Sequence, residues 1–158
     1  MDQEKATIVL FSGDMDRALA AFNIAVAAAS LGMEVEVFFT FWGLGLLSSR
    51  PYRLKVGSPL QRMLSLLSPG TPRKARLSRL NMAGLGKLAM TILMKKFRMP
   101  SLEETMETAK SMGVKFVACT TTMALMGLEE KDLPAADSFA GAASYVARAS
   151  ESKLNLFI

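Results

Sequence analysis

The chain has no histidine, and Cys119 is its only cysteine. A Ser/His/Asp triad, a Cys/His dyad and a histidine-ligated metal each need an imidazole, so these sites are excluded. A CxxC redox pair and a thiolate zinc site need more than one thiol, and a single cysteine forms no internal disulfide. We therefore expect no metal and no cofactor, and the one sulfur is the remaining candidate for chemistry.

Negative charge is missing from a long interval, because no acidic residue lies between Glu36 and Glu103 in a chain of net charge +5. Aromatic side chains that could stack on nucleic-acid bases are scarce there, with only Tyr52 and Phe97 in the basic part. This pattern favours a solvated basic segment over nucleic-acid binding, so we expect no nucleic-acid partner. The basic residues of the interval are Arg50, Arg53, Lys55, Arg62, Arg73, Lys74, Arg76, Arg79, Lys87, Lys95, Lys96 and Arg98.

No apolar run is long enough to cross a bilayer. Residues 80–94 are apolar and rich in methionine, but Lys87 interrupts them and they fall short of the ~20 residues that a transmembrane helix needs. We predict an amphipathic helix that covers a core or a partner, with contact to a membrane surface through residues 79–98 as the alternative. The charged N-terminus does not resemble a signal peptide and one thiol fits a reducing compartment, so we expect a cytoplasmic location, with membrane association as the alternative.

The first forty residues predict a strand, a helix and a second strand. Residues 6–11 are a continuous apolar run, which is typical of a strand buried on both faces. Asp14 can cap the helix that follows, and Gly32 can end it. With a further strand at residues 34–39, this is a βαβ unit whose crossover should be right-handed.

The second half of the chain continues the alternation of helix and strand. We predict a helix from a capping box of Ser101 and Glu104 to Gly113, followed by a strand that ends at Cys119. The remaining predicted elements are a helix at 121–128, a strand or turn at 137–141, a helix at 142–152 and a strand at 154–158. Such alternation predicts a single three-layer α/β/α domain over residues 1–158, with a mainly parallel sheet. Residues 41–100, which are punctuated by prolines, should form a helical and loop insertion between strands 2 and 3.

The position of the thiol is the reason to consider a chemical role. If the sheet runs in the order 2-1-3-4-5, ligands bind where strands 1 and 3 part, and the loop of Ser12, Gly13 and Asp14 would face Cys119 there. Helix-end amides after Cys119 favour its thiolate, whereas Asp14 and Asp16 oppose it. The alternative is a cysteine that acts as a small buried hydrophobe.

Four segments resemble the DsrE/DsrF-like sulfur-relay family: residues 6–12, 37–43, 117–127 and 141–158. More narrowly, they resemble its branch labelled peroxiredoxin-like, which carries a basic, Met-rich insertion before the cysteine strand. The resemblance implies a five-stranded flavodoxin-like sheet, homo-oligomers such as trimers or hexamers, and a persulfide on Cys119 that passes between donor and acceptor proteins. A peroxidase is less well supported, since residues 115–118 contain no hydroxyl and only Arg98 and Arg148 are candidate cations.

The leading hypothesis is a sulfurtransferase or sulfur carrier with Cys119 as the sulfur acceptor. Thr120 and Thr121 would supply amides and hydroxyls, the Ser12, Gly13 and Asp14 loop would line the pocket, and Trp42 would form a wall or simply pack. One alternative is a module that binds a flavin, nucleotide or other small molecule in the same crevice, although its acidic residues oppose phosphate. Another is an interaction protein that docks through the basic, Met-rich insertion.

Overall fold

The protein is described here from a computed structural model, which describes residues 3–49, 58–61, 63, 70–79 and 81–158. Arg50, Tyr52, Arg53, Lys55 and Arg62, named above, lie outside these residues, as does the first residue of the helix predicted at 80–94. The elements in chain order are β1 (Lys5–Leu10), α1 (Met15–Ser30), β2 (Glu34–Phe39), η1 (Phe41–Leu47), η2 (Pro72–Lys74), η3 (Met82–Gly84), α3 (Leu85–Lys96), α4 (Leu102–Ser111), β3 (Lys115–Cys119), α5 (Thr120–Met126), η4 (Glu130–Asp132), β4 (Ser138–Ala140), α6 (Ala142–Ser150) and β5 (Leu154–Phe157), where η marks a 3-10 helix.

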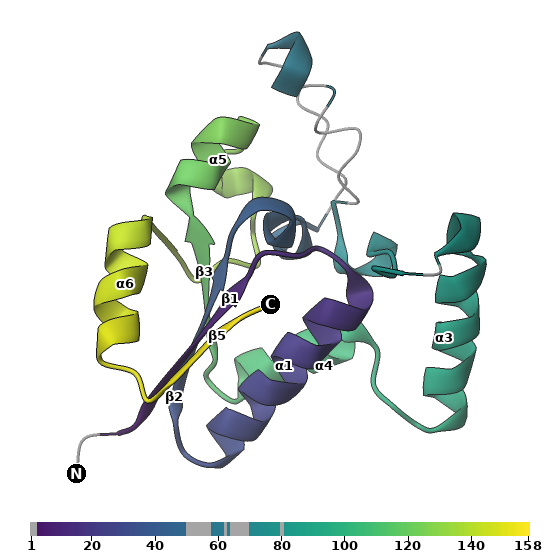
Figure 1. Cartoon of the computed structure of the whole chain (residues 1–158), viewed down its shortest axis with the longest axis horizontal. Helices are drawn as coiled ribbons and strands as arrows, with labels where there is room; N and C mark the ends of the chain where they lie inside the picture. The colour runs from purple at the N-terminus through teal and green to yellow at the C-terminus, as the bar shows by residue number, and fades with distance from the viewer. Residues whose placement is uncertain (1–2, 50–57, 62, 64–69, 80) are drawn as a thin grey trace.

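A five-stranded parallel sheet lies at the centre, with helices on both faces (Figure 1). The predicted α/β class and all five predicted strands are confirmed. The strand order is β4-β3-β2-β1-β5, which differs from the expected 2-1-3-4-5. The neighbours of β3 are therefore β2 and β4, and β1 lies one strand further away.

The faces on which the helices lie explain this order. α1 and α4 pack against each other on one face of the sheet (Figure 1). When two successive right-handed crossovers have their helices on the same face of the sheet, both add the next strand on the same side. With α1 and α4 on one face, β2 therefore lies beside β1, and β3 lies beyond β2. The order 2-1-3-4-5 would need the helix before β3 on the opposite face. α6 lies on that opposite face (Figure 1), and it returns the chain to the free side of β1 as β5.

Alternating side chains of β2 and β3 build a core on each face of the sheet. On the side of α1, Phe22 packs against Phe39 and Phe116, with ring centroids 6.1 and 5.4 Å away. On the side of α6, Phe38 packs against Tyr145 at 5.0 Å. Because successive strand residues point to opposite faces, the consecutive Phe38 and Phe39 serve the two cores.

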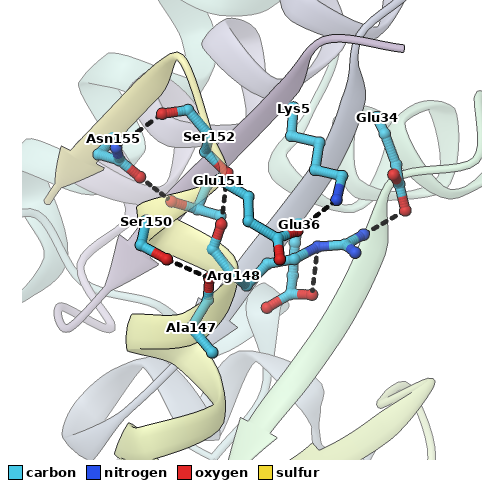
Figure 2. Close-up of polar contacts among 10 residues, drawn as sticks. Lys5, Glu34, Glu36, Ala147, Arg148, Ser150, Glu151, Ser152 and Asn155 are labelled. Carbon is cyan, nitrogen blue, oxygen red and sulfur yellow. Dashed lines mark hydrogen bonds and ion pairs between the residues drawn. The ribbon is translucent and has the colours of Figure 1, made fainter. Parts of the chain in front are cut away.

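Ion pairs hold α6 on the sheet at the end opposite to the carboxyl ends of the strands (Figure 2). Arg148 of α6 pairs with Glu34 and, at 3.6 Å, with Glu36, both on β2. Lys5 of β1 pairs with Glu151, which follows α6. Burial raises the pKa of Glu36, and the neighbouring Glu34 adds to this, while the attraction of Arg148 opposes it. The clamp fixes α6 over its face of the sheet.

The described part of residues 41–100 consists of short helices and connecting segments. One segment is tied to the start of α1, because the Met15 amide donates to the Arg76 carbonyl at 2.7 Å and Asp16 accepts hydrogen bonds from Ser78. The predicted helix of residues 80–94 is observed as α3, and the capping box of Ser101 and Glu104 at the start of α4 is confirmed. Among the described residues, no helix has the length and apolarity to cross a membrane.

Candidate functional site

Cys119 is the last residue of β3 and lies at the carboxyl edge of the sheet, as predicted. The register pairs Phe39 with Ala118, so Thr40, the residue that follows β2, is level with Cys119. On the other side Cys119 pairs with Ala140 at the end of β4. The thiol is therefore flanked by the ends of β2 and β4.

The side chain of Cys119 faces α6. With Phe38 and Val117 it forms a small buried cluster, against which Ala140 and Tyr145 pack, and Cys119 is 5% exposed. Cys119 lines neither of two cavities, of about 280 and 580 Å³, that the described residues form, so neither cavity is the open crevice expected beside the thiol. In the isolated chain the thiol lies under a cover to which Tyr145 contributes.

Polar groups nevertheless surround the sulfur. Burial raises the pKa of the Cys119 thiol, but the hydroxyl and amide of Thr122, the hydroxyl of Thr40 and the amide of Thr121 together outweigh burial, so the pKa is lowered. Cys119 is the N-cap residue of α5 without a side-chain capping hydrogen bond. A neutral thiol is a weak acceptor, whereas a thiolate is a strong one, so these donors act on the charged form.

Thr40 and Thr122 are the two site residues that the sequence argument did not select. Their hydroxyl oxygens lie 2.9 Å apart, and both hydroxyls lower the pKa of the Cys119 thiol. Thr122 is the third residue of α5, the position whose amide and side chain point back at an N-cap group. Thr40 could have been found only from the register of β2 and β3, which places it level with Cys119.

A turn after β2 connects the surroundings of Cys119 with the loop after β1. Phe41 has a φ of 45°, which is unusual for a bulky residue and is typical of strained functional turns. It lies between Thr40, which faces the sulfur, and Trp42, whose carbonyl lies against Gly13. A Cβ atom on Gly13 would be only 2.6 Å from that carbonyl oxygen, so the close approach requires glycine. The contact between the Trp42 backbone and Gly13 thus fixes the position of Trp42, whose side chain is partly exposed.

The loop of Ser12, Gly13 and Asp14 does not face Cys119 across a crevice, since β2 lies between their strands. The Ser12 hydroxyl donates to the Asp14 carboxylate at 2.9 Å and accepts the Asp14 amide at 3.1 Å. The next amide, that of Met15, is bonded to a backbone carbonyl. The amides that a phosphate would need at the start of α1 are therefore occupied, which disfavours the nucleotide alternative.

The arginines considered for peroxide chemistry lie elsewhere. Arg148 is bound to Glu34 and Glu36 near the start of β2, at the opposite edge of the sheet from Cys119 (Figure 2). Arg98 lines the 580 Å³ cavity beside α3, and Cys119 does not. In the part of the chain that the structure describes, no group of three or more histidine, cysteine or acidic side chains could hold a metal ion. The polar surroundings of the thiol are thus made of hydroxyls and amides.

The fold and the site together describe a parallel α/β protein whose single thiol, with a lowered pKa, lies at the carboxyl edge of the sheet. The chain belongs to the DsrE/DsrF/DrsH-like family, whose model matches residues 2–157. It is 43% identical to the uncharacterized protein YrkE of Bacillus subtilis over 155 residues, covering 98% of this chain and 97% of that one. It is 35% identical to the sulfur carrier protein DsrE2 of Allochromatium vinosum over the full length of both chains.

A solved structure supports the fold. The ychN protein from E. coli superimposes with a TM-score of 0.56 over 99% of this chain and 100% of its own, at 7% sequence identity.

Proposed function

We propose that this protein transfers sulfur, carrying it as a persulfide on Cys119 between a donor and an acceptor protein. Membership of the family and the full-length similarity to a protein named as a sulfur carrier support the general role. The observation that carries the assignment to Cys119 is the lowered pKa of the only thiol, with donors from Thr40, Thr121 and Thr122 around it.

The chemistry needs no second cysteine in this chain. The Cys119 thiolate attacks the outer sulfur of a donor persulfide; the sulfur–sulfur bond of the donor breaks, and the donor leaves as a thiolate with the bonding electron pair. A new sulfur–sulfur bond on Cys119 holds the transferred atom. An acceptor thiolate then attacks the same outer sulfur, and Cys119 leaves as a thiolate, so no external oxidant or reductant is consumed.

The donors around the sulfur have a role in both steps. They stabilise the thiolate that attacks the donor and the thiolate that leaves toward the acceptor. Thr120 follows Cys119 directly and its hydroxyl lies near Gly141, at the start of α6. Cys119 is 5% exposed and Tyr145 packs against the cluster that contains it. Transfer therefore requires this side chain or α6 to move, and docking of a partner protein favours that movement.

The test is mass spectrometry of the intact protein after incubation with a low-molecular-weight persulfide. We expect a mass increase of one sulfur atom on the wild type, removal of that atom by a small thiol acceptor, and no increase on Cys119→Ser. Absence of the adduct on a folded wild type, or the same adduct on Cys119→Ser, would contradict the proposal. Thr105 is a buried threonine on α4. Thr105→Val serves as the control for the general effect of replacing a buried polar side chain.

Two further expectations belong to the same proposal. We expect homo-oligomers such as trimers or hexamers. Light scattering at several concentrations measures the oligomeric state, and a strictly monomeric protein would contradict this expectation. A cytoplasmic location is compatible with an unpaired thiol, and fractionation of cells that express the full chain measures it.

A further inference from the structure

The exposed side of α3 is apolar, which is the reverse of the arrangement in an ordinary surface helix. Leu85, Leu88 and Ile92, at helical spacing on one face, are 58 to 65% exposed. Two polar residues in the middle of the helix, Lys87 and Thr91, are half-buried instead: Lys87 donates to the Arg73 carbonyl, and the Thr91 hydroxyl donates to the Lys87 carbonyl at 2.8 Å. Such a face is typical of a helix that is covered in its working state.

The same helix packs loosely on the rest of the protein. Met94 is its only buried residue, and a cavity of about 580 Å³ lies beside it, lined by residues that include Met15, Met94 and Leu102. Figure 1 shows α3 at the margin of the molecule, beyond α1 and α4. The apolar face thus points away from the core that the sheet and its helices share.

Positive charge surrounds the C-terminal end of this face. Lys95 and Lys96 lie in the last turn of α3 and Arg98 follows it, together with the exposed Phe97 and Met99. No acidic residue occurs in the chain between Glu36 and Glu103, so the segment offers no charges of its own to neutralise these cations. A covering partner must therefore supply both an apolar environment and negative charge.

A second copy of the chain fits these requirements poorly. Two such faces placed together bring cations without acidic counterparts from the same segment. A helix of twelve residues offers a face of about 18 by 10 Å, or roughly 200 Å². A stable protein interface buries about 800 Å² on each partner.

We propose that the apolar face of α3 docks on the surface of a membrane that contains anionic phospholipids. Leu85, Leu88 and Ile92 enter the boundary between headgroups and acyl chains, while Lys95 and Lys96 reach the lipid phosphates. The helix lies in the plane of the surface and does not span the bilayer. This role goes beyond the sulfur transfer proposed above and does not depend on it.

The experiment is flotation of the full-length protein with vesicles of phosphatidylcholine, with and without about one third phosphatidylglycerol. We expect binding only to the anionic vesicles, and loss of binding at high salt. Lys95→Gln/Lys96→Gln should weaken binding about 30-fold, from about fivefold for each cation at an anionic surface. Leu88→Gln/Ile92→Gln should weaken it about tenfold or more.

Matched controls make the same changes elsewhere on the surface. Leu31→Gln/Val146→Gln replaces two exposed apolar residues, and Lys115→Gln/Lys131→Gln removes two exposed cations; both should bind as the wild type does. Circular dichroism verifies that each variant is folded. All these variants should still gain sulfur on Cys119, so a failure of lipid binding is distinguishable from a failure of the proposed function.

Each other outcome overturns the lipid assignment. It is wrong if the wild type binds neither kind of vesicle, binds both equally, or loses binding in the control variants as much as in the α3 variants. Self-association in light scattering that Leu88→Gln/Ile92→Gln abolishes would instead identify a second copy of the chain as the occupant of this face.

Discussion

Replacing Thr122 by valine removes a hydroxyl that lowers the pKa of the Cys119 thiol while keeping the shape of the side chain. The site is buried, with Thr122 3% exposed, so solvent does not replace the lost donor. A hydrogen bond to a charged group contributes about 1.5–3 kcal/mol. The Thr122 hydroxyl is shared with Thr40 at 2.9 Å, so we take the lower end of that range. Since one pKa unit corresponds to about 1.4 kcal/mol, the thiol pKa should rise by about one unit.

The measurement is the ultraviolet absorbance of the thiolate against pH, with Cys119→Ser as the blank. This signal needs no reagent to reach the buried sulfur, and the chain has no other thiol to confuse it. The wild type should titrate below the ordinary pKa of a free thiol, about 8.5. Thr122→Ser, which keeps the hydroxyl, should stay close to the wild type, and Thr105→Val should not move the titration.

Two results would refute the reasoning. One is a wild-type pKa at or above that of a free thiol, which would mean that burial dominates over the donors from Thr40, Thr121 and Thr122. The other is an unchanged pKa in Thr122→Val in a protein whose melting temperature shows that it is folded, which would mean that the hydroxyl does not act on the sulfur.

Three further substitutions test the cover, the clamp and the turn. Tyr145→Ala should speed alkylation of the thiol by iodoacetamide about tenfold or more at fixed pH without raising its pKa, because it removes packing and no donor; an unchanged rate contradicts a cover. Arg148→Met should lower the free energy of unfolding by about 1–3 kcal/mol at neutral pH. The pKa of Glu36 is already raised and rises further without the cation, so this loss should shrink as the pH falls through the folded-state pKa; a loss independent of pH contradicts the account. Gly43→Ala, whose Cβ would overlap the carbonyl oxygen that ends β1, should cost about 3 kcal/mol or more in urea unfolding, whereas Gly32→Ala, in open space at a φ of 83°, should cost about 1 kcal/mol.

The elements of the fold could be predicted because each has a local cause. The apolar run of β1, the capping box at Ser101 and Glu104 and the glycine after α4 act within a few residues, and the observed boundaries follow them closely. The strand order has no such local cause. It depends on whether α4 packs beside α1 or on the other face, and its sequence satisfies either packing.

The site was predicted in part for the same reason. Cys119 at the end of a strand and the amides after it follow from local sequence. Thr40 lies far away in the chain, and only the pairing of β2 with β3 brings its hydroxyl to the sulfur. The cover by Tyr145 likewise depends on the face chosen by α6. Residues of the first loop, Ser12 and Asp14, instead bond to each other.

A lowered pKa and near-complete burial have opposite effects on the general reactivity of a thiol, but they agree with the needs of a carrier. A thiolate that solvent reached freely would react with small oxidants and lose its function, because susceptibility to oxidation follows both thiolate character and exposure. The donors from Thr40 and Thr122 favour the thiolate of Cys119, while the packing of Tyr145 against its cluster buries the sulfur. Reactivity then depends on how readily this packing is displaced, and a docked protein partner displaces it more readily than a small molecule in solution does.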